Sequence, residues 1–376
     1  MIIPRILTQK IKKYLQPNKV VVIYGPRRVG KTTLIQQFLK DIKEDYLLLS
    51  GEDRKVRTWL GSQSIDVLTQ NIGNKRLVVI DEAQKIDQIG LNLKLMVDSI
   101  DGIKIIAIGS SSFDLAKQIG EPLVGRKWQL FLYPIAQMEL SKTESIYDSK
   151  ENLPTRLVYG SYPEVITQST LSLKQQLLNS LVDGYLYKDL LELEGIKKSQ
   201  KILDLLKLIA FQIGYEVSLN ELANSLDLNQ RTVEKYLDLL EKVFVVKRVY
   251  GFSRNLRKEV TKNSRFYFWD NGIRNAIINN FNDINTRNDI GQLWENYLFT
   301  ERVKKQSYKN TLTNNYFWRT YEKKEIDLVE DRGGQLYGFE FKWGKKKSKT
   351  PKDWIDNYTN ATFETINQEN YLKFIT

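Results

Sequence analysis

A glycine-rich segment near the N-terminus constrains the fold of this chain more than any other feature. The octapeptide GPRRVGKT, residues 25–32, directly follows the apolar run KVVVIY and leads into the amphipathic stretch TTLIQQFLKDI. It fits the GxxxxGK[ST] pattern, in which backbone N–H groups at the start of a helix surround phosphate oxygens. The sequence therefore predicts a strand, a phosphate-binding loop and a helix in succession.

Three further apolar runs extend this pattern along the first part of the chain. They occupy residues 45–50, 76–81 and 104–111, and amphipathic stretches separate them. Each run is apolar throughout rather than alternating, as expected for strands that helices cover on both faces. We therefore predict that residues 1–140 form an α/β domain with a parallel sheet, of the P-loop NTPase class.

The glycine-rich loop supplies residues for binding ATP together with Mg²⁺. Gly25 and Gly30 let the backbone wrap tightly with its N–H groups pointing inward. Lys31 can reach the β- and γ-phosphate oxygens, and the Thr32 hydroxyl can ligate Mg²⁺. The residues expected to contact the nucleotide are Gly25, Pro26, Arg27, Arg28, Val29, Gly30, Lys31, Thr32 and Thr33.

Two adjacent carboxylates follow the second of the buried runs. In LVVIDEAQ, residues 77–84, Asp81 is expected to hold the Mg²⁺ shell. Glu82 is then placed to polarise a water for in-line attack on the γ-phosphate. The alternative is that both side chains only cap the following helix, in which case nucleotide binding would survive without hydrolysis.

The run that begins at residue 104 ends in the serines of GSSS, residues 109–112. Ser110 is a candidate for a hydrogen bond to the γ-phosphate or to the attacking water. Serines after a strand also serve as turn or N-cap residues, so both interpretations stay open.

After Pro134 the pattern becomes helical. Apolar positions at helical spacing indicate an all-helical connection over residues 170–210. Residues 217–249 read as a helix, a turn, a second helix and a β-branched strand, which is the order of a winged helix-turn-helix. The domains expected after the first are a helical connecting region (141–200), a winged-helix domain (201–270) and a mixed α/β domain (285–376).

The second helix of this motif carries basic residues on one face. Arg231 and Lys235 lie at i and i+4 spacing, which suits phosphate contacts. Acidic neighbours, Asp227, Glu234 and Asp238, weaken the positive field, and winged helices also serve as protein contacts. DNA binding and a structural role are both open for this helix.

The C-terminal region contains a second set of candidate catalytic residues. Asp327 and Glu340 flank the hairpin-type turn DRGGQ, so two adjacent strands could bring them together. With Glu295 they could hold Mg²⁺ or Mn²⁺, and Lys342 could position water or stabilise phosphorane charge. The alternative is a solvated charge cluster, and the nearby basic run at 342–349 is either a phosphate-backbone contact or an exposed loop.

These features together resemble a known family. The chain is similar to bacterial and archaeal AAA-family ATPases whose C-terminal half is a domain of unknown function related to PD-(D/E)xK nucleases. The resemblance includes the two nucleotide motifs, the winged helix and the set of Glu295, Asp327, Glu340 and Lys342. Four further segments match: GSSS (109–112), LVGRKWQLFLYPIAQMEL (123–140), YGSYPEV (159–165) and RFYFWDNGIR (265–274). The resemblance implies an ATPase domain followed by a restriction-endonuclease-like domain. It also suggests Arg126 as a γ-phosphate or transition-state contact, with a structural ion pair as the alternative.

Composition excludes several other functional classes. Cysteine and histidine are both absent, which removes disulfides, thiolate metal sites and His-dependent triads. The 57 basic residues exceed the 45 acidic ones, so DNA or RNA is a candidate partner, although Lys-rich composition bias explains the charge equally well. No signal peptide or membrane span is recognisable, so we expect a cytoplasmic protein without a membrane partner.

Two functions fit this sequence. The first is an ATP-dependent switch or motor acting on nucleic acid, with a nuclease-like domain at its C-terminus. The second is a regulatory ATPase of the signalling type, whose C-terminal domain binds a partner without cleaving it. In the second case the nucleotide would control assembly, including nucleotide-dependent homo-oligomers.

Overall fold

The computed structural model describes residues 3–109, 122–187, 190, 199–253, 264–320, 322 and 324–376. The chain divides into two compact units. The N-terminal unit comprises Pro4–Tyr133 with Lys242–Phe244, and the C-terminal unit comprises chiefly Pro134–Glu241 and Val245–Thr376.

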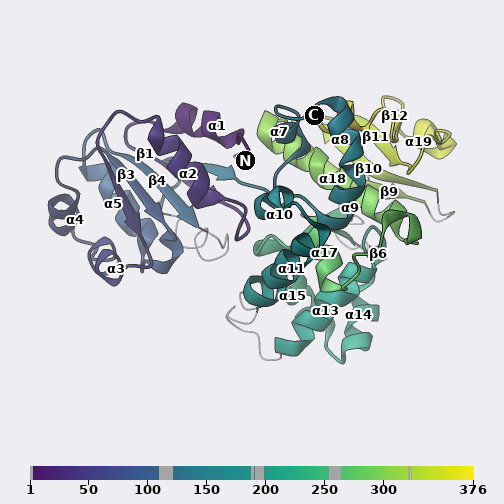
Figure 1. Ribbon diagram of the computed structural model, residues 1–376, viewed down its shortest axis with the longest axis horizontal. Coiled ribbons are helices and arrows are strands. Elements are labelled where there is room, and N and C mark those ends of the chain that lie inside the picture. The colour runs from purple at the N-terminus through teal and green to yellow at the C-terminus, as the bar shows by residue number, and fades with distance from the viewer. Residues whose placement is uncertain are drawn as a thin grey trace. The chain divides into compact units, whose positions relative to one another are not determined.

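The N-terminal unit is built on a parallel sheet, as the apolar runs predict. Its five strands lie in the order β2-β3-β4-β1-β5, and every pair is parallel. Figure 1 shows these strands side by side with helices packed around them. The described elements are α1 (Leu7–Tyr14), β1 (Lys19–Tyr24), α2 (Lys31–Lys40), β2 (Tyr46–Ser50), α3 (Arg54–Leu60), α4 (Ile65–Ile72), β3 (Leu77–Asp81), the 3-10 turn η1 (Ala83–Lys85), α5 (Ile89–Ser99), β4 (Lys104–Gly109) and β5 (Lys127–Phe131). The α/β fold class is confirmed.

The edge of this sheet differs from its centre. Strands β1, β3 and β4 are buried along nearly their whole length, which agrees with their continuous apolar sequence. Strand β2 lies at the edge, and its Tyr46 and Leu48 side chains are 40% and 49% exposed. The expectation that helices cover every run on both faces is therefore wrong for β2, because an apolar run alone does not distinguish an edge strand from a central one.

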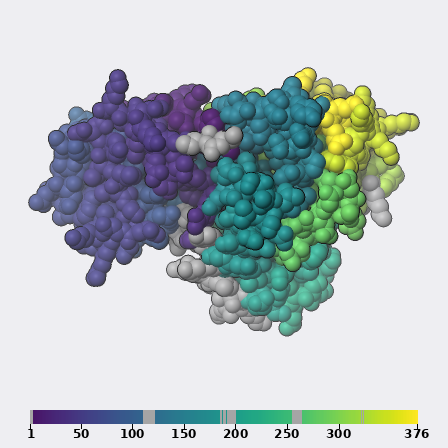
Figure 2. All heavy atoms as spheres, in the orientation of Figure 1, coloured from purple at the N-terminus to yellow at the C-terminus, as the bar shows by residue number. Residues whose placement is uncertain are grey.

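The C-terminal unit begins with a series of helices. Those before the sheet are α7 (Gln137–Leu140), α8 (Ile146–Glu151), α9 (Leu153–Tyr159), α10 (Pro163–Thr167), α11 (Leu171–Leu181), the π-helical turn η2 (Val182–Leu186) and α13 (Ser199–Phe211). In Figure 2 the atoms of the C-terminal end, in yellow, lie against those near residue 150, in teal. The Tyr371 hydroxyl donates to the Ser149 carbonyl there.

One seven-stranded sheet runs through the rest of this unit, in the order β12-β11-β10-β9-β7-β8-β6. The elements are β6 (Glu216–Val217), α14 (Leu219–Leu226), α15 (Gln230–Lys242), β7 (Val246–Gly251), β8 (Ser264–Phe268), α17 (Asn271–Ile277), the 3-10 turn η3 (Ile284–Thr286), α18 (Ile290–Lys309), β9 (Asn314–Arg319), β10 (Glu325–Arg332), β11 (Gln335–Phe341), α19 (Lys352–Asn357), β12 (Thr362–Ile366) and α20 (Tyr371–Ile375).

The expected winged-helix and nuclease-like segments share this sheet. Helices α14 and α15 and strand β7 follow one another as the sequence indicates, with Asp227 in the left-handed conformation between the helices. Strand β7, however, pairs in parallel with β9, through Tyr250 and Tyr316. The segments 201–270 and 285–376 are therefore joined by backbone hydrogen bonds, a long-range pairing that local sequence patterns do not reveal.

Helix α18 packs on this sheet and forms its main core. Trp294, Leu298 and Phe299 of the helix belong to one buried cluster with Phe339 and Phe341 of β11. Strands β10 and β11 form an antiparallel hairpin whose turn contains Gly333 and Gly334, both with positive φ. That hairpin positions the acidic residues predicted from the sequence.

Candidate nucleotide site and C-terminal charged cluster

The glycine-rich loop lies at the carboxyl end of β1 and leads into α2. A Cβ atom on Gly25 would lie 2.1 Å from the Leu132 carbonyl oxygen, so only glycine fits against the neighbouring chain. Gly30 has φ +89° and is the N-cap of α2. The first N–H groups of α2 therefore face the loop without intrahelical partners, which is the arrangement that binds phosphate at helix N-termini.

Lys31 extends back into the loop. Its Nζ atom donates to the carbonyl oxygens of Gly25 at 2.8 Å and Pro26 at 2.7 Å, and the residue is 7% exposed. The ammonium group is thus held among the backbone atoms that would surround a phosphate chain. This is the position that the loop motif predicts for it.

Thr32 and Asp81 join the loop to β3, which is separated from β1 by β4 in the sheet. The Thr32 hydroxyl donates to Asp81 Oδ2 at 2.8 Å, although the two residues are 49 positions apart. A hydroxyl and a carboxylate are the oxygen ligands that Mg²⁺ prefers, so the donor set fits the metal that accompanies ATP. Asp81 Oδ1 accepts a second hydrogen bond from the Glu82 backbone N–H at 3.0 Å.

Glu82 has an unusual backbone conformation and a defined side-chain partner. Its φ is +50°, and its Oε2 accepts a hydrogen bond from Gln84 Nε2 at 2.5 Å. Its side chain makes no capping hydrogen bond to η1, so the capping alternative does not account for it. A non-glycine residue at positive φ is strained by about 1–3 kcal/mol, and such strain is common at functional sites.

Two residues that sequence motifs did not single out support this site. A Cβ on Gly51 would lie 2.2 Å from the Glu82 carbonyl oxygen, so β2 and the acidic pair pack at a distance that only glycine permits. The buried Arg5 donates to the carbonyls of Val29 and Tyr133 at 2.9 and 2.6 Å. Arg5 therefore fixes the backbone of the loop at Val29. It belongs to no recognisable motif and lies 24 residues before Val29 in the sequence.

Arg126 lies at the opposite end of the sheet from the loop. Its carbonyl accepts from Val20 N–H at the start of β1, whereas the loop follows the end of that strand at Tyr24. A strand of this length separates the two ends by roughly 15 Å. Arg126 Nε instead pairs with Asp98 at 2.5 Å, so the structure shows the ion-pair alternative and not a contact to this chain's own γ-phosphate position.

Ser110 lies outside the residues that the structure describes. Strand β4 ends at Gly109, which is paired with Tyr24 immediately before the loop. The proposed contact from Ser110 stays a prediction.

The four residues predicted at the C-terminus do converge, together with three that were not predicted. Phe341 N–H donates to Asp327 Oδ2 at 2.7 Å, and Lys342 Nζ donates to Glu340 Oε1 at 2.6 Å. Arg265 of β8 lies among the carboxylates of Glu295, Glu325 and Asp327, and the Tyr267 hydroxyl donates to Glu295 Oε1 at 2.7 Å. We call this set the C-terminal charged cluster: Arg265, Tyr267, Glu295, Glu325, Asp327, Glu340 and Lys342.

Burial changes the acidity of this cluster. Burial, and after it the charge of Asp327, raise the pKa of Glu295 to about 8. The pKa of Glu340 is raised to about 7, first by burial and then by Asp327. Burial also raises the pKa of Asp327, although Arg265 opposes this shift. The carboxylates are therefore close enough to disfavour one another's charge.

The residues of this cluster do not fit the expected Mg²⁺ or Mn²⁺ site. Within the part of the chain that the structure describes, no three Asp or Glu side chains are grouped so that they could hold a metal ion. A guanidinium, that of Arg265, lies between Glu295 and Asp327, at 3.2 and 3.6 Å. The sequence-based expectation of a three-carboxylate metal shell is therefore corrected, because pattern and spacing did not reveal the arginine.

The other basic candidates lie on exposed surfaces. Arg231 and Lys235 are exposed on α15, and Lys345 is 3.8 Å from Glu369. Arg248 of β7 lies 3.9 and 3.7 Å from Glu234 and Asp238, so its charge partly offsets the acidic residues of α15. None of the described helices combines the length and the apolar character needed to cross a bilayer.

Comparison with known proteins shows what the first region is similar to. Residues 17–141 match the family model described as an AAA domain. This region is therefore similar to AAA domains. Two other models, both described as domains of unknown function, match residues 150–284 and 290–365, after this region.

Several relatives match this chain along most of its length. An uncharacterized protein from Mycobacterium tuberculosis is 27% identical over 346 residues, covering 91% of this chain and 73% of the relative. One from Methanocaldococcus jannaschii is 25% identical over 348 residues, covering 86% and 75%. Among solved structures, a Walker-type ATPase of Pyrococcus abyssi gives a TM-score of 0.49 at 16% identity, covering 74% of this chain and 96% of that one.

Proposed function

We propose that the protein is a Mg²⁺-dependent ATPase whose nucleotide state controls its C-terminal unit. The observation that carries this proposal is the hydrogen bond between Thr32 and Asp81. It joins the phosphate-binding loop to the acidic end of β3, which are the two parts that hold the nucleotide and its metal in P-loop ATPases.

Each residue of the site then has a defined task. The N–H groups of the loop and of the first turn of α2 bind the α- and β-phosphates, and Lys31 neutralises charge on the β- and γ-phosphates. Thr32 and Asp81 hold Mg²⁺, which when bound neutralises charge that develops on the phosphate oxygens. Glu82 accepts a hydrogen bond from the attacking water and orients it, once Gln84 gives up its own bond to Glu82.

ATP binding and hydrolysis by point variants test this proposal. Lys31→Ala should abolish measurable Mg-ATP binding in calorimetry, because it removes the buried ammonium from the loop. Lys40→Ala is the matched control, since Lys40 lies at the other end of the same helix. Equal Mg-ATP affinity in wild type and Lys31→Ala would refute the nucleotide site.

For the partner of this ATPase we propose nucleic acid. The support is the net positive charge of the chain and the exposed basic residues of α15 and of the run at 342–349. Hydrolysis measured with and without duplex DNA, single-stranded DNA and RNA tests this proposal. Stimulation by one of them would identify the partner class, and no response to any would contradict it.

A regulatory ATPase that binds without cutting is the second candidate, and the position of Arg265 favours it over a nuclease. Cleavage assays with Mg²⁺ or Mn²⁺ and ATP should compare wild type, Asp327→Ala and Lys342→Ala. Cleavage by wild type that both variants lose would establish a nuclease. ATP-dependent assembly of a Glu82→Gln variant in size-exclusion chromatography, without nucleic-acid affinity, would establish the regulatory ATPase.

A further inference from the structure

The C-terminal charged cluster already contains a cation at its centre, the guanidinium of Arg265. This side chain is 4% exposed. Its NH1 atom is 3.2 Å from Glu295 Oε1 and 3.6 Å from Asp327 Oδ1, and its NH2 atom is 2.8 Å from Glu325 Oε2. The guanidinium therefore bridges three carboxylates from α18 and β10.

Arg265 is held in this position from several sides. Its guanidinium carbon lies 4.7 Å from the centre of the Phe317 ring, a cation–π distance. Its backbone belongs to β8, a strand paired on both sides, with β7 and β6. A buried guanidinium with these contacts cannot leave without exposing uncompensated carboxylates, which costs several kcal/mol.

One oxygen each of Glu295, Asp327 and Glu340 accepts a hydrogen bond from a protein donor. Glu295 Oε1 accepts from both Arg265 and Tyr267, and Asp327 Oδ2 accepts from the Phe341 N–H. Glu340 Oε1 accepts from Lys342. One oxygen of Glu295 and one of Asp327 are therefore already directed at protein donors, and the other oxygen of Asp327 lies 3.6 Å from the guanidinium.

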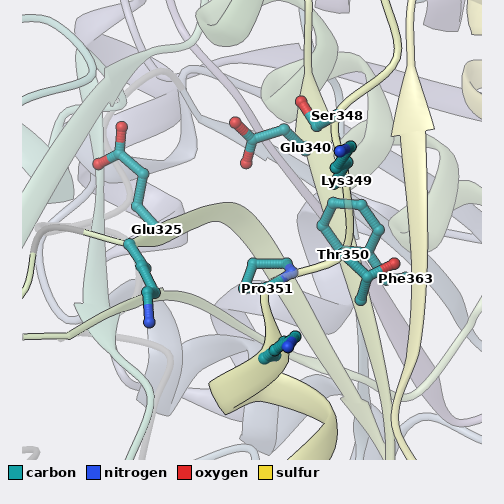
Figure 3. Close-up of a pocket in the computed structure, with 9 residues that line it drawn as sticks. Glu325, Glu340, Ser348, Lys349, Thr350, Pro351 and Phe363 are labelled. Atoms are coloured by element: carbon teal, nitrogen blue, oxygen red, sulfur yellow. The ribbon is translucent and has the colours of Figure 1, made fainter.

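Glu340 is different, because one of its carboxylate oxygens lacks a hydrogen-bond partner and the residue borders a pocket. The side chain is 9% exposed, and Oε2 has no hydrogen-bond partner among the described residues. The pocket has a volume of about 440 Å³ and is bordered by Glu325 and Glu340, by Phe363 and by three lysines, Lys324, Lys349 and Lys352. Figure 3 shows the Glu340 carboxylate extending from its strand toward the side where Glu325 lies.

We propose that Arg265 takes the place of a divalent cation in the charged cluster, so that the C-terminal unit binds its ligand in the adjoining pocket without a metal. Three lysines supply positive charge at the lining, of which Lys324 is also paired with Glu322 and Asp353, and Glu340 supplies a carboxylate there. The pocket therefore suits an anionic ligand that also carries a hydrogen-bond donor. The charged cluster itself supplies no metal-activated water.

Manganese binding tests this proposal directly. Full-length, nucleotide-free protein in an Asp81→Asn background is titrated with Mn²⁺, and free Mn²⁺ is followed by electron paramagnetic resonance. The background removes the carboxylate of the nucleotide site. Protein that retains Arg265 should have no Mn²⁺ site that depends on Asp327. An added Asp327→Asn change should therefore leave Mn²⁺ binding unaltered. Such a site in the protein with Arg265 would overturn the proposal.

Removal of the guanidinium should open the cluster to metal. Arg265→Met should bind Mn²⁺ at least about tenfold more tightly than the parent, and Asp327→Asn should abolish the gain. Arg248→Met is the control, because Arg248 lies in the same sheet outside the cluster. A folded Arg265→Met protein without any gain would contradict the proposal. If Arg265→Met does not fold, Arg265→Lys replaces it and should exclude Mn²⁺ as the parent does; a Mn²⁺ site in Arg265→Lys that Asp327→Asn abolishes would count against the proposal.

Discussion

The nucleotide site and the C-terminal charged cluster both place acidic side chains at the end of strands, but their neighbours differ. Asp81 is paired with a hydroxyl and a backbone N–H, groups that leave its negative charge uncompensated. Asp327 lies beside a buried guanidinium instead. A carboxylate motif therefore indicates where an acidic site can form, whereas the nearest cation decides whether that site is available to a metal.

The largest expected effect is on hydrolysis in the nucleotide site. Glu82→Gln removes the carboxylate that we propose orients the attacking water, so kcat should fall by about 10²–10⁴-fold. Mg-ATP affinity should be nearly unchanged, because Lys31, Thr32 and Asp81 are intact. Steady-state hydrolysis and calorimetry on the same preparation separate the two effects. An unchanged kcat would remove the catalytic difference between the two acidic sites.

Loss of the internal cation should be the next largest effect. Arg265→Met should lower the free energy of unfolding by about 3–5 kcal/mol at pH 7, because it leaves buried carboxylates without their partner. Urea denaturation measures this change, and Arg248→Met should cost clearly less, since both of its acidic partners are about half exposed. Equal losses for the two variants would show that Arg265 contributes no more to the stability of the protein than Arg248 does with its half-exposed partners.

A smaller effect, on the pH dependence of the free energy of unfolding, is expected from the C-terminal charged cluster. The pKa of Glu340 is raised to about 7, so the folded state binds a proton that the unfolded state releases near its ordinary pKa of 4.5. That contribution to stability is complete below pH 4.5 and is lost as the pH rises through 7. Glu340→Gln should therefore stabilise the protein by about 1–3 kcal/mol at pH 8.5 and by much less at pH 5.

Thermal denaturation of Glu340→Gln and wild type at the two pH values measures this difference. Glu364→Gln is a suitable control, because Glu364 lies on β12 outside the charged cluster. A stabilisation that is the same at both pH values would show that ionisation of Glu340 is not its cause.

The smallest effect is expected for Arg126. Its ion pair with Asp98 is partly exposed, so Arg126→Ala should change the free energy of unfolding by less than about 1 kcal/mol. Hydrolysis by the dilute protein should stay within about twofold of wild type, because the residue lies a strand length from the loop. A loss of activity comparable to that of Glu82→Gln would place Arg126 back in the nucleotide site.

The sequence predicted best what depends on short-range geometry. The loop, its strand and its helix are contiguous, and the pairing of Thr32 with Asp81 follows once β1 and β3, two parallel strands with β4 between them, end at the same edge of the sheet. The hairpin between Asp327 and Glu340 was likewise predictable from its glycine turn. These predictions needed only backbone periodicity and turn chemistry.

Long-range pairing was not predictable. Arg265 reaches Asp327 only because β7 pairs with both β8 and β9, which lie far apart in sequence. Its segment, RFYFW, has no charge pattern that marks it as part of an acidic site. The sequence also did not indicate that Arg126, directly before β5, lies at the end of the strands opposite the loop. The number of residues between Arg126 and the loop motif does not show at which end of the strands Arg126 lies.

The continuous sheet of the C-terminal unit has a mechanical consequence. Backbone hydrogen bonds connect β6 through β12 without interruption. Helices α14 and α15 are therefore not joined to the hairpin of β10 and β11 by a flexible hinge. A displacement imposed on those helices must bend or twist a shared elastic layer, and the strain would reach the lysine-rimmed pocket through its strands rather than through a flexible tether.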